Sequence, residues 1–232
     1  NGLSYSVQDF DGFTDGHSFS KNITVSLPGK GEDTMLLVVP VNHPPEGTAE
    51  GGSRNGSSWT LAAGLGYLLH CNKRTGREGV LPMGVTVLFA GGEYVPGSRR
   101  QMGTELFLES FFPERNLAVI YLQLGDVPGE LVVRNGEDGY FSPYWIIDRF
   151  AGSMEKSGIP AKPALEHTQL YRLGISGTES RIGGYLRQEF PALELGSGNS
   201  GSGERTGVFT GTEGRRNWLA SFLRGMDAFL EA

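Results

Sequence analysis

The stretch Met83-Gly-Val-Thr-Val-Leu-Phe-Ala90-Gly-Gly-Glu93-Tyr94 joins an apolar run to a glycine-rich turn that carries one carboxylate. A nearly continuous apolar run is typical of a strand that is buried on both faces of a parallel sheet. A carboxylate just beyond the end of such a strand lies where α/β folds hold their catalytic acids and bases. The stretch therefore predicts an α/β fold with Glu93 at its candidate site.

Further apolar runs and helical patterns alternate along the chain. The predicted strands are Ile23–Leu27 and Met35–Val41, as neighbours joined by a polar turn, then Val85–Ala90, Asn116–Leu124, an edge strand Leu131–Val133 and a central strand Ala192–Leu195. The predicted helices run from a cap at Ser57 or Ser58 to a stop at Gly76, over Arg99–Phe112, from the Ser142-Pro143 cap towards Gly158, over Thr178–Phe190 and over Asn217–Leu230. This alternation predicts a three-layer α/β/α sandwich with a mostly parallel, mixed central sheet. We expect one domain over residues 1–232, with residues 1–21 as an N-terminal extension or an extra strand.

Composition excludes several classes of protein. The formal net charge of -6 and a pI near 5.3 argue against a nucleic-acid partner or an anionic membrane surface. The single cysteine, Cys71, permits neither an internal disulfide nor a cysteine-based zinc site, and we expect it to be a buried structural thiol. No apolar run is long enough for a membrane span. The chain begins at Asn1 rather than Met, which suggests a processed or trimmed product.

Three local motifs predict little on their own. Gly196-Ser-Gly198-Asn-Ser-Gly201 has the glycine spacing of a dinucleotide loop, but a polar segment follows it instead of an apolar helix, so we interpret it as a surface loop. Gly174-Ile-Ser176-Gly177 lacks the second glycine of a nucleophile elbow. His43 and Glu93 follow predicted strands, yet no clustered metal ligands accompany them, and His43 could equally be a turn histidine.

Taken in order, several segments resemble the co-catalytic di-zinc aminopeptidase family, which includes glutaminyl cyclases and non-catalytic relatives such as nicastrin and the transferrin receptor ectodomain. The resemblance covers most of the chain from Asn22 onwards. The segments are Asn22–Gly29 for the strand and turn "NVIA-x-LPG", Leu36–Pro44 for "VVVGAHxD", Gly52–Trp59 for "GAxDNASG", Phe89–Tyr94 for "FxxxEE", Ala118–Gly125 for "NLDMIG" and Ser180–Ala192 for "SDHxPF…GIPA". The resemblance implies the zinc aminopeptidase-like sandwich, also called phosphorylase/hydrolase-like.

The departures from the family pattern fall on its metal ligands. Where the resemblance implies a histidine or carboxylate ligand, this chain carries Asn42 with His43 one place off, Pro44, Asn55 at the metal bridge, Tyr94, Gln123, and Ile182 at or near the last histidine. Glu93, at the implied general-base position, remains. Amide and phenol side chains are poor zinc ligands, and two dications repel unless a carboxylate bridges them. We therefore expect no metal and no other cofactor.

The sequence favours a pseudo-peptidase, a non-catalytic aminopeptidase-like domain that acts as a binding or scaffold module. Its candidate cleft is lined by Asn42, His43, Asn55, Glu93, Tyr94 and Gln123. We expect a peptide, a small polar ligand or another protein as the partner, and the resemblance suggests an extracytoplasmic or secreted location. The alternative is a metallopeptidase or related hydrolase of altered mechanism that uses Glu93 and His43.

Overall fold

The structure, a computed structural model, describes residues 3–12, 18–42, 56–94, 100–110, 116–125, 129–164, 180–197 and 211–231. Its strands are β1 (Tyr5–Gly12), β2 (Ser18–Leu27), β3 (Thr34–Pro40), β4 (Gly84–Ala90), β5 (Leu117–Gln123), β6 (Leu131–Arg134), β7 (Gly136–Glu137), β8 (Tyr140–Phe141), β9 (Ala161–Pro163) and β10 (Ala192–Ser197). Its helices are α1 (Gly56–Glu78), α2 (Met102–Ser110), α3 (Tyr144–Lys156), α5 (Gly183–Leu186) and α6 (Gly211–Glu231).

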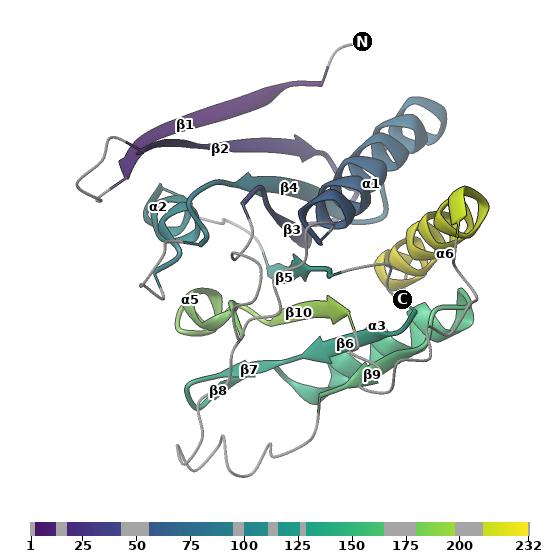
Figure 1. Cartoon of the computed structure of the whole chain (residues 1–232). Helices are drawn as coiled ribbons and strands as arrows, with labels where there is room; N and C mark the ends of the chain where they lie inside the picture. The colour runs from purple at the N-terminus through teal and green to yellow at the C-terminus, as the bar shows by residue number, and fades with distance from the viewer. Residues whose placement is uncertain are drawn as a thin grey trace.

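Eight strands form one mixed sheet in the order β1-β2-β4-β3-β5-β10-β6-β9 (Figure 1). The central strands β4, β3, β5 and β10 are parallel, whereas β2 runs antiparallel to β4 and β6 runs antiparallel to β10. All seven residues of β4 are buried, as the continuous apolar run predicts for a strand covered on both faces. The predicted α/β fold with a mostly parallel, mixed sheet is confirmed.

Helices cover both faces of the sheet (Figure 1). One apolar core lies under α1, α3 and α6, and a second lies under α2 and α5. The predicted helical face near the C-terminus is confirmed, because Trp218, Phe222 and Met226 of α6 are fully buried in the first core. The ring of Trp218 meets Trp59 of α1 edge-on, with the ring centroids 5.6 Å apart. No helix of the described segments has the length and apolarity needed to cross a membrane.

Two predictions about strand order were wrong. The strands β2 and β3 are consecutive in the chain, but β4 lies between them in the sheet. The crossover through α1 returns the chain beside β3 in parallel, and β2 then pairs antiparallel with the outer side of β4. The strand over Leu131–Val133 is not at the edge, because β9 pairs with its outer side.

Three predictions about helices need correction. The helix α1 continues past Gly76 and ends at Glu78, where Gly79 has a φ of +87°. Ser142 does not cap α3, since its hydroxyl bonds the backbone of Ala192 in β10 at 2.6 Å. Within the described part of the predicted Thr178–Phe190 helix, only the four residues of α5 are helical, because a turn follows at Arg187 and Glu189 takes a positive φ of 65°.

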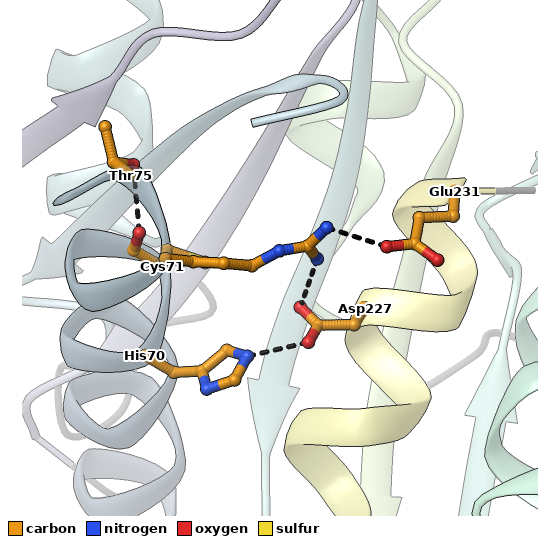
Figure 2. A network of polar contacts seen from close by, with 6 residues as sticks. His70, Cys71, Thr75, Asp227 and Glu231 are labelled. Atoms are coloured by element: carbon orange, nitrogen blue, oxygen red, sulfur yellow. Dashed lines mark hydrogen bonds and ion pairs between the residues drawn. The ribbon is translucent and has the colours of Figure 1, made fainter. Parts of the chain in front are cut away.

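A polar network joins α1 to α6 (Figure 2). The His70 ring lies 2.6 Å from Asp227 Oδ2, and Arg74 bridges Asp227 Oδ1 at 3.3 Å and Glu231 Oε1 at 2.7 Å. The Asp227 and Arg74 side chains are mostly buried, at 22% and 16% exposure. The network therefore adds directional contacts to the apolar packing between the two helices.

Candidate functional site

The carboxyl ends of β4, β3 and β5 meet at one edge of the sheet, and the predicted site residues follow them. Pro40 of β3 lies beside Ala90 of β4, and Val38 lies beside Tyr121 of β5. Asn42, Glu93 and Gln123 therefore come from three adjacent parallel strands, which is where α/β sheets place ligands. His43 and Asn55 lie outside the described residues.

Asn42 stabilises the turn after β4 through two hydrogen bonds to its backbone. Its Oδ1 accepts a hydrogen bond from the Glu93 backbone N–H at 2.9 Å, and its Nδ2 donates to the Tyr94 carbonyl at 3.0 Å. Both ends of the amide are thus engaged with the backbone on either side of the Glu93 side chain. The arrangement fixes how the turn presents that carboxylate.

The Glu93 carboxylate is fully buried and enclosed by hydrogen-bond donors. Its Oε1 accepts from the Thr104 backbone N–H at 2.7 Å. Its Oε2 accepts from the Thr104 hydroxyl at 3.0 Å, the Tyr121 hydroxyl at 2.9 Å and Gln101 Nε2 at 3.1 Å. Thr104 belongs to α2, Gln101 precedes α2 and Tyr121 belongs to β5. The carboxylate therefore links α2 to the sheet.

Burial and hydrogen bonding act in opposite directions on this carboxylate. Burial raises the pKa of Glu93, and the hydrogen bonds from Tyr121, Thr104 and Gln101 lower it, with burial the larger effect. Burial also raises the pKa of Tyr121, and the adjacent Glu93 carboxylate adds to that rise. Tyr121 therefore keeps its proton and acts as a donor to Glu93.

Arg181 is a site residue that sequence reasoning missed. It is 6% exposed, its guanidinium lies 4.4 Å from the centre of the Tyr94 ring, and its Nη1 donates to the Glu93 carbonyl at 3.3 Å. Gln101 Nε2, which also bonds Glu93, donates to the Arg181 carbonyl at 2.8 Å. The guanidinium therefore stacks on Tyr94 as a cation–π pair. The available signal was its position beside Ile182, where the family resemblance expects a functional residue.

A second buried carboxylate, Glu194 of β10, was also missed. Its Oε1 lies 2.7 Å from Arg134 Nη1, and its Oε2 accepts from the Arg181 backbone N–H at 2.6 Å. Burial raises the pKa of Glu194, and the two arginines partly offset that rise. An isolated acid within the apolar run Ala192–Leu195 was the signal, since a charge inside a central strand requires a partner.

Glu137 of β7 continues this chain of contacts towards α5. Its Oε2 accepts from the Gly183 backbone N–H at 2.5 Å, two residues after Arg181. Burial raises the pKa of Glu137 to about 7, and the nearby carboxylates of Asp138 and Glu194 add to the rise. This carboxyl group changes charge near neutral pH.

Gln123 lies at the end of β5 on the same side of the sheet as Tyr121. Its amide oxygen is enclosed and accepts no hydrogen bond from any residue that the structure describes. Among those residues, no group of three His, Cys, Asp or Glu side chains is arranged to hold a metal ion.

The other chemical candidates do not join this site. Cys71 is fully buried in α1, as predicted, and burial raises its pKa to about 12, so it is protonated at neutral pH. His70 belongs to the α1–α6 network. The Gly174–Gly177 motif lies outside the described residues, as does the Gly196–Gly201 motif beyond Ser197 at the end of β10.

Comparison with solved structures finds the same fold in bacterial peptidase-like and cyclase proteins. A zinc-dependent exopeptidase-like protein of Bacteroides vulgatus aligns over 100% of this chain and 81% of its own, with a TM-score of 0.63 and 13% identity. A glutaminyl cyclase of Bacteroides thetaiotaomicron, bound to N-acetylhistamine, aligns over 99% and 84%, with a TM-score of 0.62 and 12% identity. A leucine aminopeptidase precursor of the same species aligns over 100% and 84%, with a TM-score of 0.61 and 11% identity. Identities this low establish the fold alone.

A search of curated protein sequences gives no match to this chain. A family model described as TP_0564, first domain, matches residues 77–210. The matched segment contains β4, Glu93, α2, β5 and β10, and hence both buried carboxylates of the site. The chain therefore belongs to the TP_0564 family and carries that family's first domain on the fold shared by bacterial zinc exopeptidase-like proteins and glutaminyl cyclases.

Proposed function

We propose that this chain is a non-catalytic aminopeptidase-like domain that acts as a binding or scaffold module. The observation that carries the proposal is the closed environment of Glu93. A general base must reach the water or substrate proton that it removes. The Glu93 carboxylate is fully buried, and its two oxygens accept four hydrogen bonds from the protein.

The residues around Glu93 support the same proposal. The fold family implies zinc, which takes histidine, cysteine or carboxylate ligands. At this end of the sheet the described residues that could face a metal are Asn42, Tyr94 and Gln123. The Asn42 amide already makes two hydrogen bonds to the backbone, and the Tyr94 ring is stacked against the Arg181 guanidinium. This donor set does not fit zinc. Without a metal the pKa of water stays high, and Glu93 has no activated nucleophile to serve.

In this proposal the partner is a peptide, a small polar molecule or another protein. Asn42 and Glu93 are satisfied internally, so they shape the site and do not contact a ligand directly. The enclosed oxygen of Gln123 is the group that a ligand donor would satisfy. His43 and Asn55 stay in the proposed cleft because of their sequence positions.

The alternative is a metallopeptidase or related hydrolase of altered mechanism that uses Glu93 and His43. It is favoured by the fold likeness to proteins described as an aminopeptidase precursor and as glutaminyl cyclases. It requires the carboxylate to leave its four donors during turnover.

Metal content and activity separate the two candidates. The purified protein is incubated with zinc, dialysed and measured for bound zinc, then assayed for release of N-terminal residues and for cyclisation of N-terminal glutamine. We expect substoichiometric zinc and no turnover. Stoichiometric zinc together with an activity that Glu93→Gln abolishes, and that the exposed-site variant Glu213→Gln retains, would overturn the proposal in favour of the enzyme.

A further inference from the structure

Two carboxylates hold the backbone of residues 180–183, the segment that leads into α5. The Arg181 N–H donates to Glu194 Oε2 of β10 at 2.6 Å. Two residues later, the Gly183 N–H donates to Glu137 Oε2 of β7 at 2.5 Å. The position of this segment therefore depends on two acids that belong to different strands.

The same segment delivers a side chain to the candidate site. The Arg181 guanidinium lies 4.4 Å from the centre of the Tyr94 ring, and its Nη1 donates to the Glu93 carbonyl at 3.3 Å. Gln101 Nε2 donates to the Arg181 carbonyl at 2.8 Å. Because the guanidinium reaches Tyr94 from this backbone, opening of residues 180–183 would withdraw it from the ring.

The contact between Glu137 and Gly183 is close and lies among other charged groups. A Cβ at Gly183 would lie 2.8 Å from the Glu137 carboxylate and 3.3 Å from Arg187 Nη1, so glycine permits this approach. The charged groups that act on Glu137 are Arg187 of α5, Asp138 in the turn after β7, and Glu194 of β10. Glu137 therefore has two acids and one cation around it.

The charge of Glu137 is only partly balanced in this environment. Burial, the largest effect, and the carboxylates of Asp138 and Glu194 raise the pKa of Glu137 to about 7. Arg187 and the backbone hydrogen bond oppose this rise but do not cancel it. The cation on the β10 side, Arg134, is already paired with Glu194 Oε1 at 2.7 Å. An ionised Glu137 is therefore unfavourable while residues 180–183 cover it.

We propose that the charge of Glu137 controls this segment: when its carboxyl group ionises, residues 180–183 open more readily and the Arg181 guanidinium leaves Tyr94 more often. Opening exposes the carboxyl group to water, where it ionises near 4.5, whereas the closed segment holds the proton to about 7. Opening therefore releases a proton between these pH values and becomes more favourable as the pH rises. Its relevance rests on the proposed function, in which Tyr94 lines the binding cleft.

The test is hydrogen exchange of the Gly183 amide in the intact chain, followed by NMR at about pH 6 and about pH 8 and corrected for the intrinsic exchange rate at each pH. The opening constant should rise about tenfold between these two pH values, as the closed and open proton affinities require. Glu137→Gln should abolish the rise. Glu155→Gln, which neutralises an exposed acid of α3, is the matched control and should retain it.

A reference amide separates opening of this segment from unfolding of the whole protein. The Val119 N–H of β5 donates to the Pro191 carbonyl at 2.8 Å, and its opening constant should be smaller than that of Gly183 at both pH values. Equal opening constants at the two amides would overturn the proposal, as would a Gly183 value that does not change with pH or a rise that persists in Glu137→Gln. The measurement uses neither ligand nor zinc, so its outcome is independent of the proposed function.

Discussion

The Tyr121 hydroxyl donates a 2.9 Å hydrogen bond to Glu93 Oε2, and both side chains are fully buried. The bond joins the middle of β5 to the turn after β4. It places a neutral donor, whose own pKa is raised by burial, against the carboxylate that the sequence predicts as the candidate base. Glu93, which follows β4, therefore links this strand to α2 and β5 through its hydrogen bonds.

Removing this donor should destabilise the folded protein. Tyr121→Phe deletes the hydroxyl and leaves the Glu93 carboxylate with one fewer donor in a buried environment. We expect the free energy of unfolding to fall by about 2 kcal/mol, measured by urea denaturation. Tyr140→Phe is the control, since Tyr140 is 48% exposed, and an equal loss in both variants would contradict the role assigned to Tyr121.

Close packing of α2 on the turn after β4 should make Gly103 intolerant of a side chain. A Cβ at Gly103 would collide with the Gly91 carbonyl oxygen and lie 2.9 Å from Glu93 Oε1. Gly103→Ala should therefore lower the free energy of unfolding by about 3 kcal/mol. A Cβ at Gly152 of α3 would meet no atom of the described segments within 4 Å beyond its own helical neighbours, so Gly152→Ala should raise that free energy by about 1 kcal/mol. A neutral effect of Gly103→Ala would contradict this packing.

The carboxyl group of Glu137 should make stability depend on pH. In the unfolded chain it ionises near 4.5, whereas the folded protein holds its proton to about 7. Between these values the folded state binds more protons, so this group's contribution to stability is complete below about 4.5 and is lost as the pH rises through about 7.

Glu137→Gln removes that contribution and retains an oxygen that can accept from Gly183. The difference in unfolding free energy between variant and wild type should therefore grow in favour of the variant between pH 4.5 and pH 7. Comparing the variant with wild type isolates Glu137 from Glu93 and Glu194, whose raised pKa values act with the same sign. A difference that stays constant with pH would contradict the assignment.

The α1–α6 network should show energetic coupling between its members. A double-mutant cycle of His70→Ala and Asp227→Ala should give a coupling free energy of about 0.5 to 1 kcal/mol, because the pair is partly buried. The more exposed pair Lys162–Glu130, with side chains 74% and 33% exposed, should give a smaller coupling. Equal values for the two cycles would indicate that the α1–α6 contact is only a surface ion pair.

The Cys71 thiol should be unreactive in the folded protein. It is buried, and its pKa of about 12 leaves almost no thiolate at neutral pH. A thiol reagent such as 5,5′-dithiobis(2-nitrobenzoate) should therefore label it only after denaturation. Rapid labelling of the native protein, at a rate that denaturant does not increase, would contradict this environment.

The sequence predicted most elements because their patterns are local. Continuous apolar runs predicted β3, β4, β5 and β10, and the helical spacing of Trp218, Phe222 and Met226 predicted α6. Each of these patterns is complete within one segment. Some wrong predictions were local, such as the end of α1 at Gly76 instead of Glu78. Others concerned relations between segments, such as the position of β4 between β2 and β3 and the use of Ser142 by β10 instead of α3.

The sequence by itself determined that one acid, Glu93, follows a buried strand among amide and phenol side chains, because residue type and strand pattern are both written along the chain. Only the tertiary structure decided what that acid does. The four hydrogen bonds to its carboxylate come from Gln101, Thr104 and Tyr121. The guanidinium of Arg181, which is distant in sequence, stacks on the ring of Tyr94. Whether a carboxylate is open to a substrate or enclosed by donors depends on which distant segments pack against it, and a linear pattern does not contain that packing.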